Sequence, residues 1–176
     1  MKIKLSAFAV ALPIALTTLT GCSMTDKESD DVTQVGTSTS SDAADALEAV
    51  SSGIYDLIGV KGEASHGRAG VEECPDHDRD THFKVFHPWS FYPASASDLD
   101  EAMQNLKERL PKHGWKIVEY GPDTSKNKNI VLVADNDQEK AGVHIAKMTK
   151  RERPKLSLTL VSGCYKVPEG QKVEHF

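Results

Sequence analysis

The strongest constraint on the fold is a change in hydrophobic period near residue 115. Before it, apolar residues recur at helical spacing in two segments, from Asp42 to about Ile58 and again after Ser97. After it, apolar and polar residues alternate, which predicts strands over 115–120, 129–134, 142–148 and 156–162. Only short turn-rich sequences separate these strands, so we expect them to pair as antiparallel neighbours.

One more strand is expected earlier in the chain, from Thr81 to Phe91. Pro88 lies inside it and should confine it to a sheet edge or end it early. Residues 59–80 contain four glycines and Pro75, and they predict a long polar loop. The order is then α-β-α-β-β-β-β. We expect an α+β domain: a single antiparallel sheet of about five strands with two amphipathic helices on one face.

The N-terminus has the features of an export signal. Lys2 and Lys4 precede an apolar stretch, Leu5 to Leu19, which is shorter than the roughly 20 residues needed to span a bilayer. The next residues complete the sequence Leu19-Thr20-Gly21-Cys22, which resembles the lipobox of bacterial lipoproteins. The resemblance implies removal of residues 1–21 and diacylglyceryl modification of the Cys22 thiol. Beyond the lipobox, the chain loosely resembles small uncharacterised lipoproteins of actinobacteria.

Three regions follow from this pattern: a signal peptide (1–21), the acylated Cys22 with a flexible tether (22–41), and a compact domain (42–176). The tether is rich in Ser, Thr and acids and too poor in apolar residues to fold alone. The chain has 21 basic and 26 acidic residues, so removal of Lys2 and Lys4 leaves 19 against 26, a net charge of −7. This acidic balance predicts no general attraction for nucleic acid.

Cys74 and Cys164 are the other two cysteines. Export places them in an oxidising compartment, where an even pair is expected to form a disulfide. A bond across about 90 residues would stabilise the fold by about 4.6 kcal/mol on the chain-entropy model. The alternative, a redox-active pair, is disfavoured because such cysteines usually sit close together as Cys-X-X-Cys.

Residues 72–87 are the best candidate for metal chemistry. Asp76, Asp78 and Asp80 alternate as in a calcium loop, but the sixth position holds Thr81 instead of Gly and the twelfth holds His87 instead of Glu. The histidines His77, His82 and His87 are spaced by five, which suits neither one helical face nor one side of a strand. The sequence therefore favours a solvated acidic loop, and we assign no metal ligand and no cofactor. Metal or small-ligand binding by this segment is the alternative.

Three aromatic residues lie between the two prolines of 87–93. Exposed, they would form a partner surface. The alternation of Trp89 and Phe91 instead favours burial in the sheet, with Tyr92 facing outward.

No linear catalytic motif occurs in the chain, and the adjacent Ser65 and His66 are too common a pair to count as one. We therefore assign no catalytic residue. The sequence favours a lipid-anchored accessory or binding module without catalytic activity, on the extracytoplasmic side of the cell membrane. Its expected contacts are the lipid bilayer through acylated Cys22, an envelope protein or cell-wall partner, and no nucleic acid. A hydrolase whose site residues are distant in sequence is the second alternative.

Overall fold

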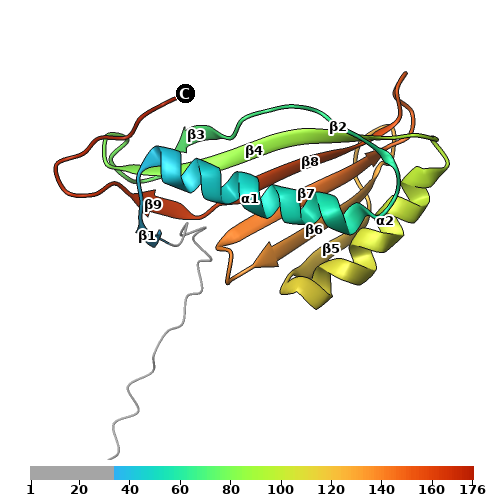
Figure 1. Ribbon diagram of the computed structural model, residues 1–176, viewed down its shortest axis with the longest axis horizontal. Helices are drawn as coiled ribbons and strands as arrows, with labels where there is room; N and C mark the ends of the chain where they lie inside the picture. The colour runs from blue at the N-terminus through green and yellow to red at the C-terminus, as the bar shows by residue number, and fades with distance from the viewer. Residues whose placement is uncertain (1–33) are drawn as a thin grey trace, which may run out of the picture. The chain divides into compact units, whose positions relative to one another are not determined.

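The computed structural model describes residues 34–176 (Figure 1). The signal segment, Cys22 and the first part of the expected tether lie outside the described residues. In chain order the elements are β1 (Gln34–Thr37), α1 (Ser40–Ile58), β2 (Gly62–Ala64), β3 (Gly70–Glu73), β4 (His82–Pro93), α2 (Asp98–Arg109), the 3-10 helix η1 (Leu110–His113), β5 (Lys116–Pro122), β6 (Ile130–Asn136), β7 (Ala141–Met148), β8 (Lys155–Ser162) and β9 (Cys164–Lys166). No helix within residues 34–176 is long and apolar enough to cross a membrane.

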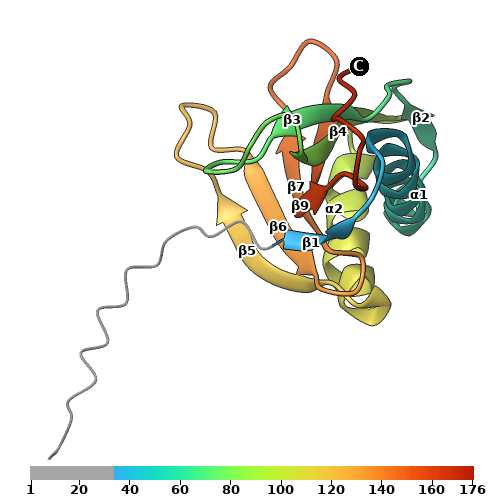
Figure 2. The same ribbon diagram turned by 90° about the vertical axis from the view of Figure 1, so that its left-hand side faces the viewer.

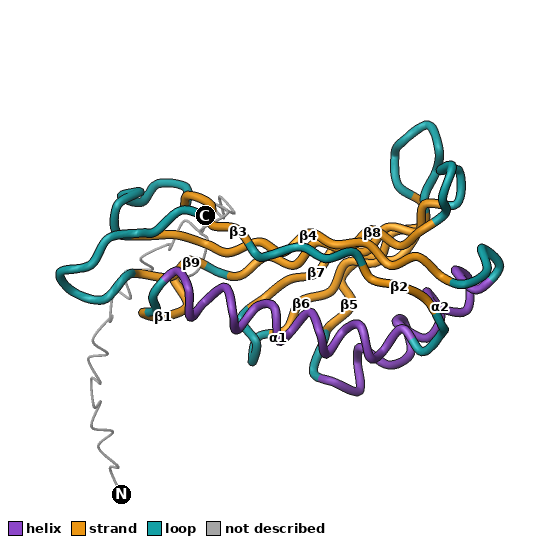
Figure 3. The backbone as a smooth tube through the Cα atoms, turned by 45° about the horizontal axis from the view of Figure 1, so that its top comes forward, coloured by secondary structure: helices purple, strands orange, loops and turns teal. Residues whose placement is uncertain are grey.

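All nine strands belong to one sheet. Seven follow each other in the order β1-β9-β4-β8-β7-β6-β5, while β2 and β3 pair with successive parts of β4. The β1–β9 pair is parallel, and the other pairs are antiparallel. The sheet curls into a half-barrel (Figure 2). β1 and β9 lie at one end of this sheet, and the β5–β6 and β7–β8 turns project from the other end (Figure 3).

The expected fold class, a single antiparallel sheet of about five strands with both helices on one face, is wrong. The sheet is mixed and has nine strands, because β1, β2, β3 and β9 are only three or four residues long and too short to show an alternating pattern. Two of these short strands lie in the segment expected to be a loop. Helix α1 packs on β3, β4 and β8, whereas α2 packs on α1 and leads through η1 to β5, so the curled sheet wraps around the helices.

Helix α1 begins at Ser40, two residues before the start expected from the sequence at Asp42. Thr39 is its N-cap, with Oγ1 accepting a hydrogen bond from the backbone N–H of Asp42 at 3.1 Å. Gly59 ends the helix in the left-handed conformation, at φ 69°. The folded part of the chain also includes β1, which the sequence assigned to the tether.

Pro88 neither ends β4 nor places it at an edge, in contrast to the expectation. β4 pairs with β8 on one side, where Pro88 lies opposite Thr159, and with β2 and β3 on the other. Ser90 bonds to Ser65 on the β2–β3 side, so Pro88, two residues earlier, also directs its nitrogen to that side. There β3 and β2 leave a gap at residues 65–69, and the missing N–H therefore breaks no strand pairing.

The core fills the space between the helices and the curled sheet. Trp89 is 6% exposed and Phe91 is fully buried, which confirms the burial predicted for both rings. Tyr92 is partly exposed, as expected. The largest fully buried side chains come from α1, β4, α2, η1, β6, β7 and β8: Ile54, Ile58, Phe83, Phe91, Leu99, Met103, Leu106, Leu110, Leu132, Ile145, Leu156 and Leu158.

Candidate functional site

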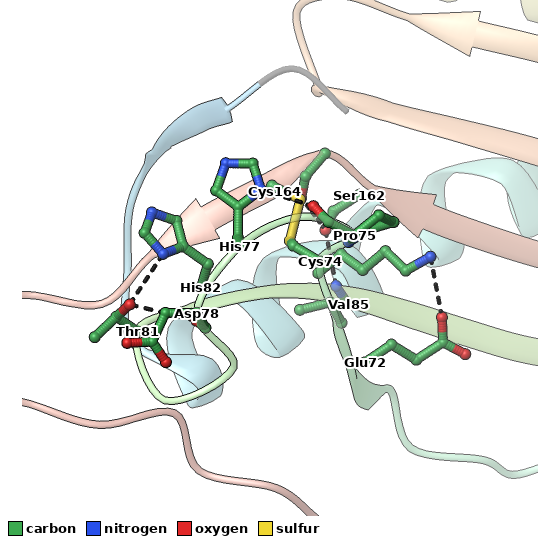
Figure 4. The surroundings of a disulfide bond; sticks show 12 residues. Glu72, Cys74, Pro75, His77, Asp78, Thr81, His82, Val85, Ser162 and Cys164 are labelled. Carbon is green, nitrogen blue, oxygen red and sulfur yellow. Dashed lines mark hydrogen bonds and ion pairs between the residues drawn. A yellow bond between two sulfur atoms is a disulfide. The ribbon is translucent and has the colours of Figure 1, made fainter. Parts of the chain in front are cut away.

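The predicted disulfide is present between Cys74 and Cys164 (Figure 4). The Cα atoms of the two residues are 6.0 Å apart, and 90 positions separate them in the sequence. The bond connects the loop that follows β3 to the first residue of β9. It thus ties the expected acidic loop to the end of the sheet where β1 also pairs.

The acidic segment beside the disulfide is held by its own hydrogen bonds. Asp78 Oδ1 accepts the backbone N–H of Asp80 at 2.9 Å, and His77 Nδ1 donates to the Pro75 carbonyl at 2.8 Å. The Lys172 ammonium donates to Asp80 Oδ2 at 3.0 Å, and this bond and its charge lower the pKa of the Asp80 carboxyl. These contacts engage Asp78 and Asp80, two of the three alternating carboxylates of this segment.

The histidines of residues 72–87 do not come together. The His77 and His82 rings are neighbours, with centroids 4.7 Å apart, but His87 lies further along β4 and contacts α1 instead. No cluster of three or more potential metal-ligating side chains occurs in the described part of the chain. The metal-binding alternative therefore has no geometric support among residues 34–176.

The most promising site is a pocket of about 340 Å³ between α1, β4 and residues 64–67. Ser51 and Tyr55 are one helical turn apart on α1, and they meet His87 and Trp89, which are two residues apart on β4. Four helical residues rise about 6 Å and two strand residues about 6.7 Å, so the two side-chain pairs align. The full lining is Glu48, Ser51, Ser52, Tyr55, Asp56, Ala64, Ser65, His66, Gly67, His87 and Trp89.

His87 is buried and has a partner for each ring nitrogen. Nε2 lies 3.2 Å from the Gly67 carbonyl oxygen, which can only accept a hydrogen bond, so the neutral ring carries its proton on Nε2. Nδ1 is then an acceptor, and the Ser51 hydroxyl donates to it across 2.7 Å. The backbone therefore fixes both the tautomer of His87 and the direction of the Ser51 proton.

Trp89 contributes the one buried side-chain donor without a partner among residues 34–176. Its Nε1–H is covered and makes no hydrogen bond. The ring packs at 6.3 Å, centroid to centroid, from the ring of Tyr55, which is 39% exposed. A buried N–H without an acceptor is uncommon and points to a missing partner.

The segment 65–69, whose first three residues line the pocket, is held at both ends. Glu48 Oε1 accepts the backbone N–H of Ala69 at 2.8 Å and also pairs with Arg68. Ser65 donates its N–H to the Ser90 carbonyl at 2.8 Å and accepts the Ser90 N–H on Oγ at 2.9 Å. This one segment is therefore fixed to β4 at its start and to α1 at its end.

A larger hollow of about 600 Å³ lies beside the β6–β7 turn. Its charged lining residues, Asp135, Asp137 and Lys140, are exposed, and it contains no aromatic ring. None of its described lining residues has a buried polar side-chain atom without a partner, whereas Trp89 of the α1–β4 pocket has one, so we favour the α1–β4 pocket in spite of its smaller volume.

Comparison with known proteins gives no relative for this chain. No family model matches it, and neither a curated protein nor a solved structure shows significant similarity. The functional argument therefore depends on the geometry of the site.

Sequence reasoning found only part of this pocket. His87 and Trp89 were singled out, while Ser65 and His66 were set aside and now line the pocket. Ser51 was missed, although a signal was present: it is a polar residue on the apolar stripe of α1, among the buried residues Leu47, Ile54 and Ile58. A polar residue at such a position needs a hydrogen-bond partner when buried.

Proposed function

We propose that this chain is an exported, lipid-anchored binding protein that holds a small neutral organic ligand in the pocket between α1 and β4. The observation that carries the binding role is the unpartnered Nε1–H of Trp89, whose side chain lines the pocket. A buried donor without an acceptor costs about 1–3 kcal/mol. A ligand oxygen that accepts this N–H removes that cost, and the recovered free energy favours binding.

The ligand reaches the indole nitrogen past Tyr55. This side chain is 39% exposed and packs against the rings of Trp89 and Phe91, so its rotation is the proposed route to the buried Nε1. Glu48 and Asp56 also line the pocket; Glu48 is paired with Arg68, while Asp56 forms no ion pair among the described residues and leaves negative charge there. A ligand with a carbonyl or hydroxyl oxygen fits these walls better than a carboxylate does.

Export and anchoring are supported by two features distant in the sequence. The lipobox at Leu19–Cys22 predicts acylation of Cys22, and the Cys74–Cys164 disulfide is of the kind that persists in oxidising compartments. Two or three acyl chains would hold the protein stably on the outer side of the cell membrane, whereas a single chain holds only marginally. An envelope protein or a cell-wall component is then the expected partner.

Mass spectrometry of the native protein tests the anchor. We expect a mature chain that begins at Cys22 and carries the mass of a diacylglyceryl group. An unmodified Cys22, or a chain that retains residues 1–21, would contradict the proposal.

Ligand-observed NMR with a fragment library of neutral, acidic and basic members tests the pocket, on the mature chain with Cys22→Ser. We expect neutral fragments with an acceptor oxygen to bind. Trp89→Phe keeps an aromatic ring but removes the N–H, and should weaken these fragments about tenfold, the equivalent of one hydrogen bond. Trp115→Phe alters the other tryptophan, which is also buried, and is the matched control. No binding, or equal weakening in both variants, argues against this site.

A hydrolase is the second candidate, because the Ser51–His87 contact has the arrangement of a nucleophile and a base oriented by a third group. Two observations place it second. Ser51 is 4% exposed, and as an interior residue of α1 it offers no free backbone N–H to stabilise an oxyanion. A fluorophosphonate probe should label the wild-type chain and spare Ser51→Ala if this candidate is correct; absence of labelling removes it.

A further inference from the structure

Two hairpin turns project side by side from the end of the sheet opposite to β1. They are the β5–β6 turn, residues 123–129, and the β7–β8 turn, residues 149–154 (Figure 3). The strand order β8-β7-β6-β5 makes these hairpins adjacent. Since neighbouring strands are about 4.8 Å apart, the centres of the two hairpins are about 10 Å apart.

These turns concentrate positive charge in an acidic chain. Together with the first residue of β8 they contain six basic residues and two acidic ones, whereas the chain as a whole has a formal net charge of −5. The basic residues, which we call the cationic tips, are Lys126, Lys128, Lys150, Arg151, Arg153 and Lys155.

Four of these cations have no acidic partner among the described residues: Lys126, Lys128, Lys150 and Arg151 are absent from every ion pair there. The acid nearest in sequence to the first two is Asp123, and its carboxylate is already used. It accepts hydrogen bonds from Ser125 and Asn129, which lower the pKa of the Asp123 carboxyl. The positive charge of the first turn is thus not neutralised within the turn.

The other two cations are held against an aromatic ring. The Arg153 guanidinium lies 4.0 Å from the centroid of the Tyr92 ring, and Lys155 Nζ lies 5.8 Å from it. Lys155 also donates to Ser90 Oγ at 2.9 Å, and Arg153 pairs with Glu63. Arg153 and Lys155 are therefore held in place, whereas the other four cations of the tips are unpaired within residues 34–176. The surface is thus partly organised before it binds a ligand.

We propose that the cationic tips bind a phosphodiester polymer of the cell envelope. Lysine and arginine both suit phosphate oxygens, and a polymer with regularly spaced phosphates can contact both hairpins across about 10 Å. The inference goes beyond ligand binding in the pocket and rests on one part of the proposed function, the anchor at Cys22.

The predicted anchor joins the domain at the end of the sheet opposite to the tips. Eleven residues separate Cys22 from Gln34, so β1 stays within about 40 Å of the acylated end. The cationic tips lie at the far end of the sheet, beyond the eight residues of β8, a length of about 26 Å. When β1 faces the membrane, the tips point outward, and a polymer with regularly spaced phosphates can then contact both hairpins.

Binding to long-chain inorganic polyphosphate and to poly(glycerol phosphate) tests this surface, on the mature chain with Cys22→Ser. We expect binding that weakens steeply with salt. The variant Lys126→Gln, Lys128→Gln, Lys150→Gln, Arg151→Gln should lose at least about tenfold in affinity and show a shallower salt dependence. The control variant Lys107→Gln, Lys112→Gln, Lys116→Gln, Lys166→Gln has the same net charge, and it should change affinity less than about twofold.

Three results would overturn the inference. The first is no binding to either polymer, or equal losses in the two variants. The second is equal binding to polyaspartate, which would show that phosphate is not recognised. The third is binding to phosphatidylglycerol vesicles in preference to the polymers, which would assign the tips to a membrane. Acylation of Cys22 is measured separately, so an acylated chain that ignores the polymers refutes this inference and leaves the anchor standing.

Discussion

At the scale of single residues, the pocket depends on a polar contact inside an otherwise apolar interface. Ser51 and His87 join α1 to β4 between side chains that are mostly hydrocarbon. Buried polar groups are tolerated only when they are hydrogen-bonded, and here the hydroxyl and the Gly67 carbonyl satisfy both ring nitrogens. The contact therefore sets the position of α1 on β4, and with it the alignment of Tyr55 and Trp89.

Replacement of Ser51 by Ala should lower the free energy of unfolding by about 1–3 kcal/mol, because His87 Nδ1 then keeps no donor while it stays buried. Urea denaturation at neutral pH measures the change. Ser52→Ala is the matched control: the neighbouring hydroxyl is exposed and bonds only to the Glu48 carbonyl one turn earlier, so its loss should cost less than about 0.5 kcal/mol. Equal effects of the two substitutions would mean that the Ser51–His87 contact is not stabilising.

Residue-level features that depend on one chemical rule were predictable from the sequence. The expectation of export predicted the Cys74–Cys164 disulfide, and the alternating pattern predicted that Trp89 is buried. The Ser51–His87 contact was not predictable, because its partners are 36 positions apart and belong to elements whose relative register only packing decides. The same applies to the hydrogen bond from Ala69 to Glu48.

At the scale of elements, β4 organises the molecule. It pairs with β8 along one side, with β9 near its start, and with β3 and β2 in turn along the other side. The break between β3 and β2 accommodates Pro88 and provides residues 65–67 as a wall of the pocket. Pro88, which led us to expect an edge strand, thus lies beside the unpaired segment that lines the pocket.

Close packing of β2 on β4 requires glycine at position 62. A Cβ atom there would overlap the Phe91 ring and the Tyr92 backbone carbonyl. We therefore expect Gly62→Ala to destabilise the fold by about 1–3 kcal/mol, as overpacking does, in thermal or urea unfolding. Gly53→Ala is the control, since nothing lies within 4 Å of its added methyl group inside α1, and it should stabilise the fold by about 0.5–1 kcal/mol. A neutral Gly62→Ala would show that β2 is loosely held.

The long elements could be predicted from the sequence and the short ones could not. Both helices and strands β4 to β8 carry seven or more residues, enough for the period of 3.6 or 2 to emerge. The short strands depend on pairing with β4 or β9 and leave no periodic trace. Because the missing strands are those that extend and curl the sheet, an accurate list of long elements still gave the wrong fold class.

At the scale of the whole molecule, the two ends of the sheet differ. One end holds β1, β9 and the disulfide, and is where the chain arrives from Cys22. The other end holds the cationic tips, while the pocket lies between them along α1 and β4. If Cys22 is acylated as proposed, the pocket and the charged turns are both separate from the end of the sheet that the anchor joins.

The disulfide should stabilise the whole fold, because it joins segments 90 positions apart and restricts the unfolded chain. Loss of the bond in Cys74→Ser, Cys164→Ser should lower the free energy of unfolding by about 2–5 kcal/mol, measured by urea denaturation on the Cys22→Ser background. Reduction of the chain that retains both cysteines should give a similar loss, which separates the cross-link from the effect of the serines. An unchanged free energy of unfolding would contradict this prediction. Strain in the folded state would then have to cancel the free energy gained by restricting the unfolded chain, and the bond would serve to position the β3–β4 loop rather than to stabilise the domain.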